Sequence, residues 1–210
     1  EEIWFPHTAA DIQIVHTKLC KYVLKLPWQA PNNFVRGELG RFPLTCYYYL
    51  KPIRYWLRLT EMPNTRMHSV FYKCQYIWAE SGCECWALHV KNLLIRHGFG
   101  YAWYKQSVGN KALFLQKIHQ RLKDVSLQNW TSELRESNRL SNYNLIKSHF
   151  GLEPYLNQSR QYHHRSLLIR FRGGLLPVIC NSGVYQSIPW EQIICPLCNL
   201  GIETEYHFLL

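Results

Sequence analysis

The sequence predicts an all-α fold, an irregular multi-helix array with a small appendage at the C-terminal end. Apolar residues recur every three or four positions through most of the 210 residues, and the alternation typical of half-buried strands is scarce. A Cys-x2-Cys pair followed by a histidine comes after a stretch that has no regular period. The first two observations predict packed helices, and the third predicts that the appendage is zinc-knuckle-like.

The N-terminal helices have recognisable ends. Thr8 and Asp11 have the spacing of a capping box, and Pro27 cannot continue a helix, so a helix is expected between them. Residues 31–44, which include GELGRFPL, are expected to form a short helix and a turn. Another helix is expected to begin or kink at Pro52. The apolar residues of the first helix recur at helical spacing and are Ile12, Val15, Leu19, Tyr22, Val23 and Leu26.

Further helices are expected along the rest of the chain, with ends assigned from capping residues and glycines. They span residues 64–78, 85–97, 111–136, 141–150 and 163–172. Residues 101–110 are expected to form a loop, and the pattern is irregular after residue 174. The chain is therefore divided into N-terminal helices (1–60), a basic helical array (61–174), and a linker with the cysteine-containing unit (175–210).

Positive charge is concentrated in the middle of the chain. Residues 51–150 contain 15 Lys and Arg against 6 Asp and Glu, and so supply +9 of the formal net charge of +10. This concentration favours a polyanionic partner, most simply RNA or DNA, over a basic surface that serves only solubility. No apolar run approaches the roughly 18 residues of a membrane span, so no membrane partner is expected.

Seven basic residues are the candidate contacts to nucleic-acid phosphates. Each could instead belong to a solvated helix face beside core residues, and Phe171 is available to stack on a base. The tryptophans are expected in the core. The candidate phosphate contacts are Arg54, Arg58, Lys117, Arg121, Lys123, Arg170 and Arg172.

The cysteine-containing unit has the spacing of a zinc site. Cys195 and Cys198 can place two thiolates on one tight turn, and His207 can add an imidazole to the same Zn²⁺ ion. A fourth ligand at the usual spacing would lie at about residues 211–213, so an incomplete site is expected. The alternative is a half-site that binds no metal. Possible substitute ligands are Cys180, His163 and His164, whereas Cys83 and Cys85 are expected to be structural.

The residues of common catalytic sites are missing from the sequence. Two-metal nucleotidyl transfer needs clustered carboxylates, but Asp11 and Asp124 are the only aspartates and lie far apart. P-loop, G-x-S-x-G and H-E-x-x-H motifs are also absent. The chain is therefore expected not to be an enzyme, and a Cys–His nucleophile pair is the remaining catalytic alternative.

An ordered set of short motifs resembles the C-terminal region of polyproteins from non-LTR (LINE-type) retrotransposons, downstream of the reverse-transcriptase domain. The set begins with GELGRFPL, YWLRL and HGFGYAW, and continues with RLKD, QNW and SNRL. It ends with ICPLC and EYHFLL. Cys195, Cys198 and His207 match the family's knuckle, whose closing cysteine would lie at about residue 212.

The resemblance implies a fragment that is a non-catalytic, nucleic-acid-binding accessory region lacking the polymerase. Its implied partners are template RNA or target DNA and the reverse-transcriptase domain of the parent polyprotein. The implied location is intracellular, both nuclear and cytoplasmic. The alternative is a structural remnant that once packed on the polymerase domain and binds no nucleic acid alone. A large exposed apolar patch would favour that alternative.

Overall fold

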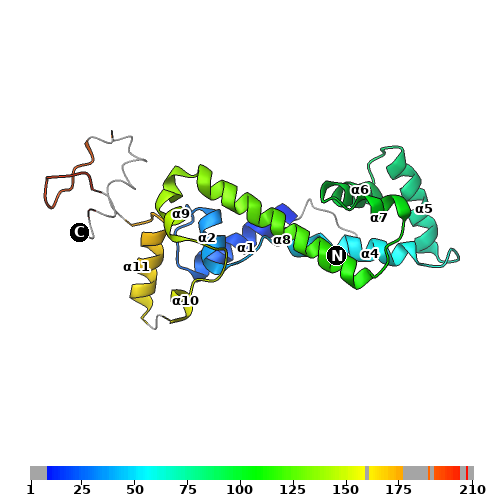
Figure 1. Cartoon of the computed structure of the whole chain (residues 1–210), viewed down its shortest axis with the longest axis horizontal. Coiled ribbons are helices and arrows are strands. Elements are labelled where there is room, and N and C mark those ends of the chain that lie inside the picture. The colour runs from blue at the N-terminus through cyan, green and yellow to red at the C-terminus, as the bar shows by residue number, and fades with distance from the viewer. Residues whose placement is uncertain (1–8, 159–160, 177–188, 190–191, 204–206, 208–210) are drawn as a thin grey trace. The chain divides into compact units, whose positions relative to one another are not determined.

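The computed structural model describes residues 9–158, 161–176, 189, 192–203 and 207 (Figure 1). Within these residues the regular structure is helical, and β-pairing is limited to two isolated bridges. The all-α prediction is therefore confirmed. None of the described helices is both long and apolar enough to cross a membrane.

Contacts divide the chain into two compact units. The first unit joins residues 1–16 to residues 42–129, and the second joins 17–41 to 130–210. Helix α1 (Ala9–Val23) and helix α8 (Lys111–Glu136) contribute residues to both units. The segments predicted from the sequence follow composition along the chain, whereas these units follow contacts between distant stretches, so the two divisions differ.

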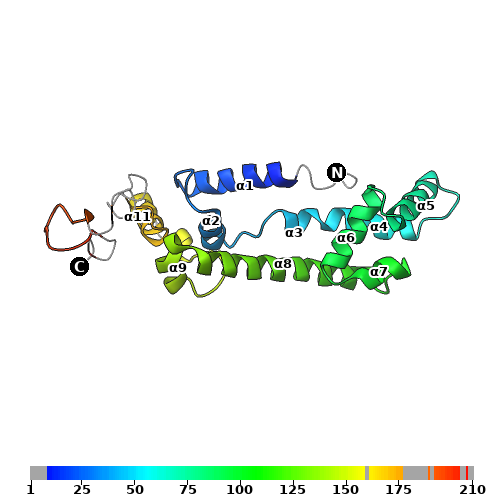
Figure 2. The same ribbon diagram turned by 90° about the horizontal axis from the view of Figure 1, so that it is seen from above.

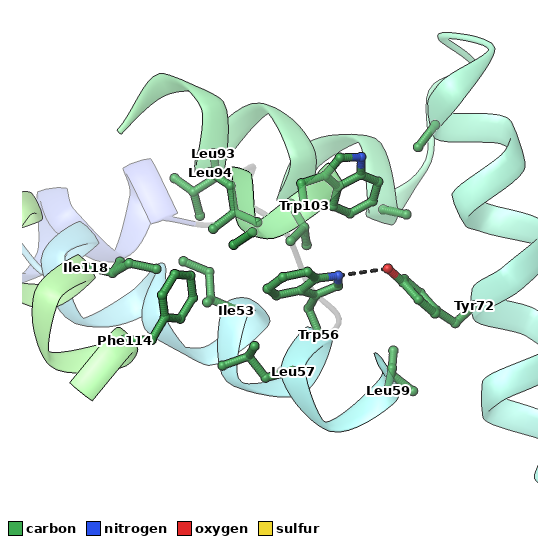
Figure 3. Packing of buried hydrophobic residues seen from close by; sticks show 14 of the residues in the cluster. Ile53, Trp56, Leu57, Leu59, Tyr72, Leu93, Leu94, Trp103, Phe114 and Ile118 are labelled. Atoms are coloured by element: carbon green, nitrogen blue, oxygen red, sulfur yellow. Dashed lines mark hydrogen bonds between the residues drawn. The ribbon is translucent and has the colours of Figure 1, made fainter. Parts of the chain in front are cut away.

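The first unit is built around two stacked indoles. Trp56 and Trp103 are fully buried, and their ring centroids lie 6.1 Å apart. Nε1 of Trp56 donates a hydrogen bond to the hydroxyl of Tyr72 at 2.8 Å, and Figure 3 shows leucines, Phe114 and Ile118 around the same indole. Its helices besides α1 and α8 are α3 (Thr45–Tyr48), α4 (Leu50–Thr60), α5 (Met67–Glu80), α6 (Trp86–Arg96) and α7 (Gly100–Lys105).

The predicted helices of this unit begin and end within about three residues of the observed ones, and α5 begins at Met67, not at the predicted Asn64. Pro52 lies in the first turn of α4, where a missing N–H leaves no intrahelical bond unmade. The prediction of a loop over residues 101–110 is wrong for its first part, because α7 is a helix. Ala102 and Trp103 of α7 are fully buried in the core, so tertiary packing selects a helix that local sequence does not indicate.

The second unit packs α2 (Asn32–Leu39) against the end of α8 and the segments that follow it (Figures 1 and 2). Phe34 and Tyr143 meet edge to face with ring centroids 4.8 Å apart, and Ile169 completes the same core. The other helices of this unit are η2 (Asn138–Leu140), α9 (Ser141–Ile146), α10 (Tyr155–Gln158) and α11 (Tyr162–Arg172).

The GELG sequence lets α2 approach its neighbours closely. A Cβ atom on Gly37 would lie 2.6 Å from the Tyr143 hydroxyl and 2.8 Å from the Trp130 ring. Gly40 ends α2 in the left-handed conformation with φ of 60°, and its Cβ would lie 2.5 Å from the backbone nitrogen of Leu152. Both positions therefore require glycine for packing or backbone geometry.

The burial of α1 and of the tryptophans departs from the sequence pattern. The apolar residues of α1 at helical spacing are mostly exposed, from 46% for Ile12 to 79% for Tyr22, whereas Thr17 and Cys20 are buried. Trp28 and Trp78 are 79% and 54% exposed, so the placement of all tryptophans in the core is wrong for these two. Apolar spacing identifies a helix but does not show what covers it.

Candidate nucleic-acid interface and metal site

Helix α4 presents two arginines on the side opposite its buried residues. Ile53, Trp56 and Leu57 fill the core, and this orientation leaves Arg54 and Arg58 exposed one turn apart. The guanidinium of Arg58 lies 5.1 Å from the ring centroid of Tyr55. The sequence pattern of α4 therefore places two candidate phosphate contacts side by side on the surface.

These arginines line two hollows that share Arg58 and Lys111. The first hollow, of about 270 Å³, is lined by Arg54, Tyr55 and Leu115 in addition to the shared pair. The second, of about 580 Å³, extends along residues 61–68. We name the combined surface the basic groove. Its charged residues and its histidine are Arg54, Arg58, Glu61, Arg66, His68 and Lys111.

The basic groove has an excess of positive charge. Four cations face one carboxylate, which leaves +3 when His68 is neutral. Lys111 forms an ion pair with Glu61, but both side chains are substantially exposed, so solvent screens this pair. No carboxylate of the described residues forms a salt bridge with Arg54, Arg58 or Arg66. Their charges remain available to an anionic ligand.

The candidate contacts on α8 lie outside the basic groove. Lys117 and Arg121 are exposed one turn apart. The pKa of His97 is lowered first by burial and then by the positive charges of Arg96 and Arg121. Positive charge is therefore also concentrated around His97. The structure therefore separates these predicted residues from the α4 pair, although all of them lie in the first unit.

Lys123 lies beside Phe42, apart from both the basic groove and the pair formed by Lys117 and Arg121. Its Nζ atom is 5.6 Å from the ring centroid of Phe42. Burial, followed by the charge of Lys123, lowers the pKa of His119. Lys123 contributes to the basic character of α8 but is not part of the basic groove.

Arg172 differs from the other predicted phosphate contacts, because it is already paired with carboxylates. The sequence placed it among the phosphate contacts, but its side chain is only 12% exposed and forms salt bridges at 3.0 Å with Glu38 and Glu153. Two carboxylates already satisfy this guanidinium, so we remove Arg172 from the candidate interface. Arg170 is half-buried on the same helix, and its Nε atom has no hydrogen-bond partner among the described residues.

The three predicted metal ligands come together. The Sγ atoms of Cys195 and Cys198 and a ring nitrogen of His207 all lie within 4.8 Å of one another. Nε2 of His207 is 3.0 Å from the Cys198 sulfur. The structure therefore contains a Cys–Cys–His cluster of a size that could hold a metal ion.

Backbone hydrogen bonds shape the turn that carries the cysteines. The N–H of Asn199 donates to the carbonyl of Cys195 at 2.9 Å, and the N–H of Cys195 donates to Gly201 at 2.8 Å. The Leu200 N–H donates to the Cys198 sulfur at 3.4 Å. This hydrogen bond is the main cause that lowers the pKa of the Cys198 thiol to about 7, with His207 contributing. Thiolate, the metal-binding form, is therefore accessible near neutral pH.

The donor set suits zinc better than hard cations. Two sulfurs and one imidazole are ligands typical of tetrahedral Zn²⁺, whereas Ca²⁺ and Mg²⁺ prefer oxygen. His163 and His164 are exposed on α11 and do not belong to the cluster. Cys180 lies outside the described residues. The Sγ of Cys85 donates to the carbonyl of Gln75 at 3.4 Å, while Cys83 is exposed.

Two members of the basic groove, Arg66 and Lys111, were not among the residues predicted from the sequence. Arg66 immediately precedes α5 and Lys111 begins α8, so each lies at a helix end rather than in a repeating basic face. Only the approach of these ends to α4 brings them beside Arg58. Comparison with known protein families, with curated proteins and with solved structures finds no match for this chain.

Proposed function

We propose that this chain is a non-catalytic nucleic-acid-binding accessory region of the type that follows the reverse transcriptase in non-LTR retrotransposons. The observation that carries the binding proposal is the basic groove, in which four cations face one carboxylate. The retrotransposon origin rests on the order of the sequence motifs. That origin also supports an intracellular location, nuclear and cytoplasmic, and a reverse-transcriptase domain as the protein partner.

The geometry of α4 suits the contact with a phosphate backbone. Residues four apart on a helix are separated by about 6 Å along its axis, so Arg54 and Arg58 can each engage a different phosphate. Guanidinium groups bind phosphate oxygens through paired hydrogen bonds. Lys111 supplies a further positive charge to both hollows. These contacts hold RNA or DNA without reading its sequence.

The test is equilibrium binding of a structured RNA and of duplex DNA to the unaltered chain and to Arg54→Gln/Arg58→Gln. We expect the dissociation constant of the variant to be at least about tenfold higher, because two charge-assisted contacts are lost. The matched control is Lys18→Gln/Arg135→Gln, which removes the same charge from exposed positions outside the groove. Equal loss in both variants would mean that net charge, and not the groove, determines binding.

Zinc at the Cys–Cys–His cluster is the second part of the proposal. Cys195, Cys198 and His207 would hold the ion and so order the surrounding segment. The remaining coordination position would accept water or a fourth side chain. The ion would have a structural role, since none of the proposed contacts to nucleic acid depends on its chemistry.

A structural role without nucleic-acid binding is the second candidate function. The observation that favours it is the exposure of large apolar side chains on α1 and α5, such as Val15 at 66% and Ile77 at 65%. Exposed apolar faces of this kind mark protein contacts. Absence of binding to either polymer at low salt would leave this candidate as the better account.

A further inference from the structure

Helix α5 carries a continuous apolar face that the described residues of the first unit leave uncovered. Ser69, Tyr72 and Ala79 are buried on the side that packs against the core. Figures 1 and 2 show the other labelled helices of this unit on one side of α5. We name the opposite face the α5 stripe, and it consists of Met67, Val70, Phe71, Cys74, Ile77 and Trp78.

Every residue of the α5 stripe is exposed. The exposed fraction is 63% for Phe71, 65% for Ile77 and 54% for Trp78, and Cys74 is exposed as well. The stripe repeats after seven residues, since positions 67, 70 and 71 are followed by 74, 77 and 78. This spacing is the one by which helices pack against each other at a shallow angle. A second helix is therefore the shape that fits the stripe.

The charged residues beside the stripe indicate which kind of partner it can bind. Lys73 and Glu80 are seven residues apart and therefore lie along one edge of the stripe, and Arg66 immediately precedes the first turn of the same helix. In an antiparallel pair of identical helices, Arg66 of each copy lies opposite Glu80 of the other. Glu80 uses Oε1 to bind Lys91 and Trp103 but remains 39% exposed, so it can accept a further contact. The two Lys73 residues face each other and oppose the pairing weakly.

We propose that the α5 stripe is the interface between two copies of this chain, with the two α5 helices antiparallel. The two aromatic and four smaller side chains offer several hundred Å² per copy, which is of the order of the ~600–800 Å² that each partner contributes to a specific interface. The pairing is isologous, because each copy presents the same face to the other.

A groove beside the stripe provides an anchor site for the partner. It has a volume of about 260 Å³ and is lined by Met67 and Phe71 of the stripe together with Tyr55, Leu59 and Trp86. Antiparallel pairing brings the C-terminal half of one α5 to the N-terminal half of the other. Trp78 of each copy therefore lies near this groove of its neighbour, and a buried aromatic of this kind dominates binding at many interfaces.

The first test is the molar mass of the full chain in solution, measured by sedimentation from about 1 to 100 μM with reductant present. We expect a concentration-dependent dimer. Phe71→Glu should weaken dimerisation by about 30-fold or more, because it places a charge in the centre of an apolar contact. Leu113→Glu is the matched control, since Leu113 is 49% exposed in the same unit but lies outside the stripe. It should leave the dimer unchanged.

A second test probes the antiparallel arrangement. A Lys73→Glu chain mixed with the unaltered chain should form the mixed dimer in preference to either homodimer, since opposite charges then meet at the centre. A statistical mixture would overturn the antiparallel geometry. A monomer at every concentration, or a dimer insensitive to Phe71→Glu, would overturn the interface itself and would leave a different protein as the partner of the stripe.

Discussion

Arg172 binds the carboxylate of Glu38 with two nitrogen atoms, Nε at 3.2 Å and Nη2 at 3.0 Å, although 134 positions separate the two residues. Glu38 is fully buried, and the hydroxyl of Tyr155 also donates a hydrogen bond to it. Glu153 joins the same network and pairs with Lys147. The network therefore ties α2 to the end of α11 within the second unit, and two carboxylates balance two cations.

Replacement of Arg172 by methionine should destabilise the protein by about 3–5 kcal/mol, because it leaves the Glu38 carboxylate buried without its main counter-charge. Urea unfolding monitored by circular dichroism measures this change. The double variant Glu38→Gln/Arg172→Met should lose less than the sum of the single variants, since it leaves no uncompensated charge at this pair. An additive result would show that the two side chains do not depend on each other.

Replacement of Gly37 by alanine should cost about 1–3 kcal/mol of stability, because the new methyl group meets Tyr143 and Trp130 at less than 3 Å. The control is Gly109→Ala, since a Cβ at Gly109 has no atom within 4 Å. Thermal unfolding of the two variants should show a clear loss of Tm in the first and little change in the second. Similar Tm values in both would contradict the close packing of α2.

Nucleic-acid affinity should fall steeply as salt increases, because each phosphate contact releases counterions. Arg54→Gln/Arg58→Gln should reduce the slope of log K against log[salt] by roughly 1.4–1.8, which corresponds to two lost contacts. Fluorescence anisotropy between 50 and 300 mM salt gives the slope. An unchanged slope would mean that neither arginine contacts a phosphate.

Purified protein should contain about one zinc ion per chain, measured by elemental analysis. Cys195→Ser should remove most of it, whereas Cys83→Ser, which alters an exposed cysteine outside the cluster, should not. The affinity for zinc should also decrease as the pH falls below the Cys198 pKa of about 7, because protons then compete with the metal ion for the thiolate. Equal zinc content in both variants would contradict the assignment of the ligands.

Stability should decrease as the pH falls from 7.5 to 5.5. Burial lowers the pKa of both His97 and His119 in the folded protein, so the unfolded chain binds more protons once the pH falls below about 6.5. The two histidines cost no stability above that pH. The loss grows between the unfolded pKa of about 6.5 and the lower folded pKa, and it becomes constant below the folded pKa.

The variant His97→Gln/His119→Gln should therefore show a smaller loss of unfolding free energy between these two pH values. His68→Gln is the control, because His68 is exposed. Denaturant unfolding at each pH gives the free energies. A loss as large in the double variant as in the unaltered chain would assign the acid sensitivity to other groups.

Most helices could be predicted from the sequence because their signals are local. The 26 residues of α8 coincide with the predicted range, where apolar residues recur on one face. Helix α7 could not be predicted in this way, since it is short and its helical state depends on burial of Trp103 against Trp56. The metal cluster was also predictable, because a tight turn between two cysteines imposes their proximity and a histidine nine residues later can fold back onto them.

The sequence by itself determined that this protein is helical, that its middle is basic, and that two cysteines and a histidine can share one ion. The tertiary structure alone decided which basic residues can face a ligand and which apolar faces are covered. Arg58 and Lys111 line the same groove, whereas Arg172 is buried against Glu38. The physical reason is that the electrostatic role of an arginine depends on its neighbours in space, and contacts between residues 38 and 172 leave no periodic signal along the chain.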